Sequence, residues 1–146
     1  MVTDTEPGRE ILSATDCWDR LREAPVGRLA VIVHSHPEIF PVNHLVDDGS
    51  LLFRSAEGTK LAGAVGHVVA FEIDGYDLEA GTAWSVMVKG QAVEVTRMDD
   101  IKDILGYPLF PWHIGHKPHF IRIEPISTTG RLYQLARNEL TANAGG

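Results

Sequence analysis

Gly27-Arg-Leu-Ala-Val-Ile-Val-His34 and the residues that follow it carry the strongest indication of the fold. It is β-branched and almost entirely apolar, which predicts a strand buried on both faces. Ser35-His-Pro37 predicts a turn, and residues 38–46 predict a strand that returns beside the first. Asp47-Asp-Gly-Ser50 is a strong hairpin signal and leads into a third strand, Leu51-Leu-Phe-Arg-Ser55. These segments predict an antiparallel meander.

The rest of the chain continues this pattern. Alternating or β-branched runs predict strands over residues 67–74, 82–96 and 119–124, and a short seventh strand within 126–135. Helices are expected from Ser13, the predicted N-cap, to the residue before Pro25, and over 61–65 and 98–105. Gly90 predicts a bulge or a close backbone approach inside its strand. Six or seven strands joined mostly by hairpins predict a mainly β fold, a closed or nearly closed antiparallel barrel capped by the helices.

The composition is that of one acidic domain. The 146 residues and 16.0 kDa fit a single domain, which we place at residues 13–136 between loose termini at 1–12 and 137–146. Lys plus Arg number 13 and Asp plus Glu number 20, so the net charge of −7 argues against nucleic-acid binding and against adhesion to anionic membranes. Cys17 is the only cysteine, which excludes an intrachain disulfide. We expect a cytoplasmic protein, because no signal-peptide pattern and no apolar run of about 18 residues occurs.

A local basic cluster nevertheless follows the third strand. Arg54 and Lys60 bracket a short loop, Ser55 and Thr59 add hydroxyl donors, and Gly58 allows a close backbone approach. The predicted helix begins at about Thr59, where its first N–H groups would favour an anion. The segment therefore predicts a phosphate site. The alternative is that Thr59 only caps the helix and the basic side chains are solvated.

Two strands carry further candidates. Pro41 indicates a strand edge or bulge, and Asn43, on the same face, has the donor and acceptor needed to bind the edge of a planar heterocycle. Trp84 is either a stacking residue or part of the core, and core is the commoner role. Lys89, on the opposite face of that strand, either reaches a phosphate across the sheet or is solvated.

Four segments in this order resemble a known family. They are Gly27-Arg-Leu-Ala30, Pro37-Glu-Ile-Phe-Pro-Val-Asn43, Phe53-Arg-Ser55 with Gly58-Thr-Lys60, and Trp84-Ser-Val-Met-Val-Lys-Gly90. Over residues 13–130 the chain resembles the pyridoxamine 5′-phosphate oxidase-like split-barrel proteins, and most closely their small flavin-nucleotide-binding and nitroimidazole-resistance-type branch. The resemblance implies a six-stranded antiparallel, Greek-key split barrel, a homodimer with two cofactor sites at its interface, and FMN as the cofactor of a flavin-dependent oxidoreductase.

The resemblance also implies a set of cofactor-binding residues. By this resemblance, the phosphate and the ribityl chain are bound by Arg54, Ser55, Thr59 and Lys60, and the ring is lined by Pro41, Val42 and Asn43. Trp84 and Ser85 lie beside the cofactor, and Lys89 is a further candidate for binding the phosphate. The substrate-phosphate residues of true pyridoxamine phosphate oxidases have no match, so vitamin B6 oxidation is not expected. No acid–base pair stands out, and no catalytic side chain is assigned.

Three other functions stay open. One is a reductase that uses a deazaflavin, although acidic segments such as Asp47-Asp48 disfavour its long anionic tail. Another is a non-enzymatic carrier or sensor of flavin or heme, and the last is an unliganded structural domain. The histidines of His113-Ile-Gly-His116-Lys-Pro-His119 suggest zinc by spacing, but Gly115 and Pro118 oppose a regular helix, and we expect no metal site. This loop is instead expected at the dimer interface, over the flavin ring, or packed locally against the barrel.

Overall fold

The computed structural model describes residues 9–56, 62–96 and 118–135. Within them the chain is mainly β, with one α-helix and one 3-10 turn. The strands are β1 (Arg9–Ile11), β2 (Val26–Val33), β3 (His36–Asp47), β4 (Ser50–Ala56), β5 (Val68–Asp77), β6 (Thr82–Glu94) and β7 (Pro118–Gln134). The helix is α1 (Ala14–Glu23), and the 3-10 turn is η1 (Ala62–Ala64). None of the described helices has the length and hydropathy needed to cross a membrane.

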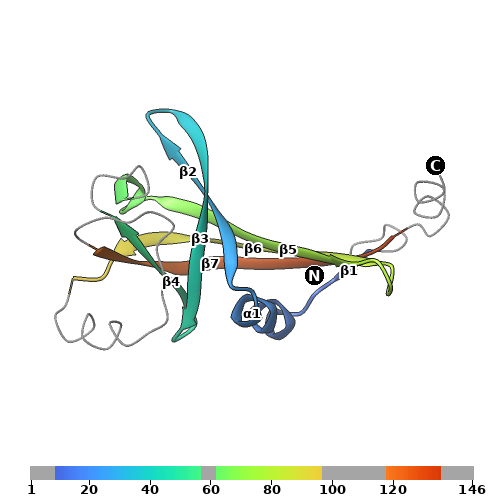
Figure 1. Cartoon of the computed structure of the whole chain (residues 1–146). Helices are drawn as coiled ribbons and strands as arrows, with labels where there is room; N and C mark the ends of the chain where they lie inside the picture. The colour runs from blue at the N-terminus through green and yellow to red at the C-terminus, as the bar shows by residue number, and fades with distance from the viewer. Residues whose placement is uncertain (1–8, 57–61, 97–117, 136–146) are drawn as a thin grey trace.

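The strands form a closed antiparallel ring. Their order is β7-β4-β3-β2-β5-β6, and β6 pairs back onto β7, which confirms the predicted six-stranded barrel. β1 pairs with β7 outside this ring, although its residues fall in a segment expected to be loose. β7 is one long strand where the sequence predicted two, because residues 118–123 pair with β4 while the same strand continues along β6. Figure 1 shows the β2–β3 hairpin crossing the long strands β5, β6 and β7.

Two tight turns set the meander. Asp48 (φ 50°) and Gly49 (φ 71°) both lie in the left-handed region, which is the backbone that a two-residue hairpin requires. The β2–β3 turn uses His34 (φ 51°) and Ser35 (φ 66°) in the same way. This turn therefore lies one residue earlier than the sequence predicted, and β3 already begins at His36.

Helix α1 covers one opening of the barrel. The side chain of Ser13 accepts a hydrogen bond from the backbone of Asp16, as the predicted N-cap requires. Cys17 and Leu21 are its buried residues. Cys17 packs so closely on β7 that a Cβ added at Gly130 would lie 2.5 Å from its Sγ. The helix is therefore anchored to the barrel by its apolar face.

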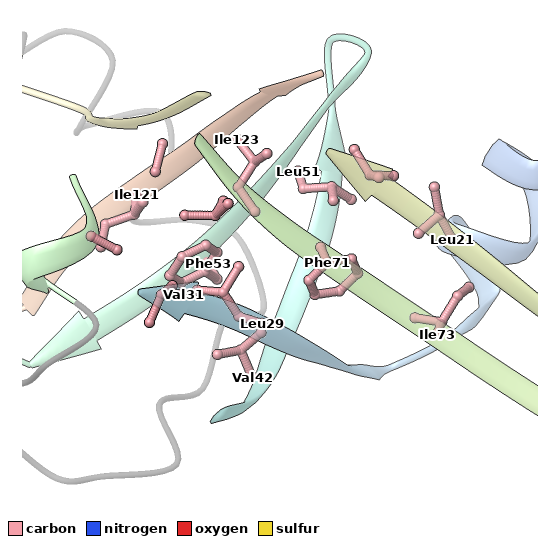
Figure 2. Close-up of a cluster of buried hydrophobic side chains, with 14 of the residues drawn as sticks. Leu21, Leu29, Val31, Val42, Leu51, Phe53, Phe71, Ile73, Ile121 and Ile123 are labelled. Carbon is pink, nitrogen blue, oxygen red and sulfur yellow. The ribbon is translucent and has the colours of Figure 1, made fainter. Parts of the chain in front are cut away.

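The core lies inside the ring. Side chains from α1, β2, β3, β4, β5 and β7 point into one cluster (Figure 2), with Phe53 and Phe71 its largest fully buried members. β2 contributes Leu29 and Val31, but Ile32 is 67% exposed. The prediction that this strand is buried on both faces is wrong, because the barrel interior covers only one face of each strand.

Gly90 lies at a register shift between β6 and β7, as predicted. Lys89 pairs with Ser127 and Gly90 with Pro125, which leaves Ile126 as the extra residue. A Cβ at position 90 would lie 2.3 Å from the carbonyl oxygen of Glu124, so only glycine fits. Of the predicted helices, that over 98–105 lies outside the described residues, and the described part of the 61–65 helix is the 3-10 turn η1.

Candidate functional site

The predicted ring-binding residues lie where β3 leaves β4. The pairing of these strands ends at His44 and Phe53, so Asn43 and Arg54 are the next residues on each strand. Over residues 36–43, β3 pairs with β2 on one side only in the described part of the chain, which agrees with the strand edge that Pro41 predicts. The side chain of Val42 is 4% exposed and lies in the core. Pro41 and Asn43 therefore face outward, and Val42 offers only its backbone to this edge.

The predicted phosphate residues lie at the end of β4. Arg54 pairs with Phe120, and its guanidinium carbon lies 5.8 Å from the centre of that ring. Ser55 pairs with His119 and is 4% exposed, on the face of β4 opposite to Arg54. The other two members of the predicted phosphate set, Thr59 and Lys60, fall outside the described residues. The barrel rim thus holds both described members of the set on adjacent positions, with their side chains on opposite faces of β4.

A histidine and a glutamate complete this rim. Nδ1 of His119 contacts Oε1 of Glu94, so the pair joins β7 to β6 beside Ser55. Nε2 of His119 and Nε of Arg54 are buried and find no hydrogen-bond partner among the described residues. Sequence reasoning did not find Glu94, because only the β6–β7 register brings it to residue 119.

The candidates on β6 lie far from this rim in the same chain. Val95 donates its backbone N–H to Phe120 at 2.8 Å and is therefore level with Arg54. Lys89 is six residues earlier, or about 20 Å along an extended strand. Ser85 and Trp84 are further away still, and Trp84 lies about 35 Å along the strand from the level of Arg54. One chain does not bring these three residues to Arg54.

Trp84 is occupied by packing within the chain. Its ring packs against the core cluster, and a Cβ added at Gly75 would lie 2.8 Å from it. The guanidinium carbon of Arg20, on α1, lies 4.6 Å from its ring centre, which is a cation–π contact. Within one chain, the surroundings of Trp84 are therefore those of a core residue.

The outside of the sheet presents an apolar surface, the outer apolar face, formed by Ile32, Ile39 and Val68. These side chains are 67%, 67% and 59% exposed. Together with Ala30, Ala70 and Lys89 they line an open cavity of about 330 Å³. Ala70 and Lys89 are cross-strand partners, so Lys89 lies at the border of this face. Exposed aliphatic side chains gathered in this way are typical of a contact surface.

An ionic cluster lies next to the outer apolar face. Arg28 donates to Glu72 at 2.8 Å and also to Asp74, and it is the register partner of Pro41. Burial raises the pKa of the Glu72 carboxyl, whereas the hydrogen bond from Arg28 lowers the pKa of Asp74. The cluster holds two carboxylates and one guanidinium, which disfavours a polyanionic ligand beside Pro41.

A second cavity, of about 530 Å³, lies between α1, the β3–β4 turn and the bulge of β7. Arg22 is the charged residue in its lining, and it pairs with Asp19 at 3.0 Å. This cavity contains none of the predicted cofactor residues.

Within the described ranges, no group of three His, Cys, Asp or Glu side chains is arranged to hold a metal ion. His113 and His116 lie outside those ranges.

Comparison with known proteins identifies the class to which this barrel belongs. A family model described as pyridoxamine 5′-phosphate oxidase matches residues 13–132, and the chain belongs to that family. The chain is similar to a solved FAD binding protein from Mycobacterium smegmatis, with 39% identity, a TM-score of 0.76, and coverage of 86% of this chain and 99% of that chain. The resemblance and the split-barrel fold predicted from the sequence are thereby confirmed.

Two further relatives extend the comparison. The uncharacterized protein Rv0080 of Mycobacterium tuberculosis is 38% identical over 112 residues, which cover 71% of this chain and 72% of that protein. An FAD-binding protein from Mesorhizobium loti is 23% identical, with a TM-score of 0.66 and coverage of 85% of this chain and 97% of that chain. At that identity the second likeness shows the fold alone.

Proposed function

We propose that this protein binds a flavin nucleotide and acts as a flavin-dependent oxidoreductase on a small molecule. The observation that carries the proposal is that Asn43 and Arg54 directly follow the last paired residues of β3 and β4, in a chain of the pyridoxamine 5′-phosphate oxidase family. An amide that can bind a heterocycle edge and a guanidinium that can bind a phosphate thus lie at the same end of this ladder. A bound flavin would supply the hydride chemistry, and the protein would bind and orient it.

The residues have separate roles in this proposal. Arg54 and Ser55 hold the phosphate at the barrel rim, together with Thr59 and Lys60 from the resemblance. Pro41 and the backbone of Val42 line the ring, and Asn43 binds its polar edge. FMN and FAD share the half that these residues would contact. FMN follows from the family resemblance, whereas FAD is favoured by the 39% identical relative from Mycobacterium smegmatis.

We further propose a homodimer formed through the outer apolar face. A second copy would cover Ile32, Ile39 and Val68, and it could bring Lys89, Trp84 and Ser85 to the cofactor, which one chain does not. The test is light scattering after gel filtration. Ile39→Glu is expected to give a monomer with weakened flavin binding. Ile126→Glu, at an equally exposed position elsewhere, is the matched control and is expected to leave the dimer intact. A wild-type monomer would refute the dimer.

The cofactor is tested by the spectrum and mass of the ligand that copurifies, followed by titration with FMN, FAD, riboflavin and a deazaflavin. We expect a yellow protein that binds FMN or FAD more tightly than riboflavin. Arg54→Gln should weaken both nucleotides, and Arg22→Gln, a solvent-exposed arginine, is the control. A colourless protein that binds neither nucleotide would refute the proposal. Tighter deazaflavin binding would replace the cofactor, and bound flavin that no nicotinamide nucleotide reduces would favour a carrier or sensor.

A further inference from the structure

His119 and Glu94 form an ion pair at the barrel rim, where the proposed phosphate residues also lie. His119 is the second residue of β7, and its register partner Ser55 is the last residue but one of β4. Direct cross-strand partners in an antiparallel pair have Cβ atoms about 5 Å apart. The imidazole therefore leaves the sheet beside the Ser55 hydroxyl, on the same face of the sheet.

The ion pair determines which ring nitrogen can bind a ligand. Glu94 contacts Nδ1 and so fixes the orientation of the ring. Nε2 is buried, and among the described residues it has no hydrogen-bond partner. In the imidazolium form Nε2 carries a proton and is the donor left for a ligand. Ser55 from β4 and Glu94 from β6 face this ring, while Arg54 lies on the other face of β4.

We infer that His119 is a phosphate-binding residue of the proposed flavin site, oriented by Glu94. Its Nε2–H donates a hydrogen bond to the phosphate next to the ribityl chain, beside the Ser55 hydroxyl of the adjacent strand. The inference rests on the proposed function and adds to it a hydrogen-bond donor from β7. Affinity for the phosphate-bearing flavin should then depend on His119, and affinity for riboflavin should not.

The test compares FMN with riboflavin in the full-length protein. Dissociation constants are measured by flavin fluorescence for the wild type, His119→Gln and His36→Gln, whose histidine is exposed in the β2–β3 hairpin. We expect His119→Gln to weaken FMN at least about tenfold, because a charge-assisted hydrogen bond is lost, and to leave riboflavin unchanged. His36→Gln should bind both flavins as the wild type does.

Three results would overturn the inference. Unchanged FMN affinity in His119→Gln would show that the ring does not bind the phosphate, and equal losses for FMN and riboflavin would show a structural role. If His119→Gln does not fold, Glu94→Gln retains the imidazole but removes the contact that orients it, and it should weaken FMN alone; no change there also overturns the inference. A wild-type chain that binds neither flavin refutes the proposed function itself.

Discussion

Replacing Gly27 with alanine should destabilise the barrel by overpacking its core. A Cβ at position 27 would lie 2.1 Å from Cζ of Phe71 and 2.7 and 2.8 Å from the neighbouring ring carbons. Ordinary contacts begin at 3.4 Å, so the ring must retreat by roughly 1.3 Å. Phe71 is fully buried, and its ring also packs edge to face on His44 with ring centres 4.8 Å apart. Since the ring has little room to move, we expect a loss of about 3 kcal/mol, the upper end for an overpacked core.

A double-mutant cycle isolates the cause. Phe71→Leu removes the ring atoms that the added methyl group at position 27 would meet, and by itself it should cost about 1–2 kcal/mol in lost burial. The double variant, Gly27→Ala with Phe71→Leu, should lose at least about 1 kcal/mol less free energy of unfolding than the two single losses added together. Gly63→Ala is the control, because a Cβ there would have no neighbour within 4 Å.

The assay is urea unfolding followed by circular dichroism at one fixed chain concentration, because association would change the apparent stability. The cycle requires an unchanged slope of free energy against urea in all variants. Single changes that add to within about 0.5 kcal/mol would refute the steric argument, since independent sites behave in that way. A Gly27→Ala variant as stable as Gly63→Ala would refute it directly.

Three further predictions follow from contacts elsewhere. Burial lowers the pKa of His44, whose Nε2 lies 2.8 Å from the carbonyl oxygen of Leu21. The unfolded chain then binds more protons as the pH falls through about 6.5, so urea unfolding should show stability decreasing toward acidic pH, and less steeply in His44→Gln. Arg122→Ala removes hydrogen bonds of 3.0 and 3.1 Å to Asp47 at the β3–β4 turn, and the free energy of unfolding should decrease by about 1.5–3 kcal/mol. A midpoint of thermal unfolding equal to that of the wild type would contradict this prediction. Arg20→Ala removes the cation that packs on the Trp84 ring, and the free energy of unfolding should decrease by about 0.5–1 kcal/mol in the same assay. The stability of Arg20→Lys should lie between those of Arg20→Ala and the wild type.

Much of the candidate site could be named from the sequence, but its arrangement could not. The phosphate segment and Asn43 follow from residue types and from the family resemblance. That Asn43 and Arg54 leave the same end of the β3–β4 ladder depends on its register, in which 44 pairs with 53. The distance of Lys89 from Arg54, and the partnership of His119 with Glu94, depend on how β6 and β7 pair. Cross-strand partners far apart in sequence leave no signal in a single chain.

The features that could be recognised from the residues alone are local ones. The Ser13 cap, the turn at Asp48 and Gly49 and the bulge beside Gly90 each require a backbone conformation or a close approach that few residue types allow. Such constraints act within a few residues, so they can be recognised before the fold is known. The alternation of apolar residues likewise indicates strands, and enough of them predict a barrel.

Which face of each strand enters the core, and which strand lies beside it, depends on the closed barrel. The apolar run of β2 does not reveal that Leu29 enters the core while Ile32 stays 67% exposed, since both are equally apolar. Nor does the sequence show that β7 passes through Pro125 as one strand, because proline is tolerated only where the bulge opens the ladder. Closure of the ring settles both points, since one face of every strand must turn inward and β7 must reach both β4 and β6.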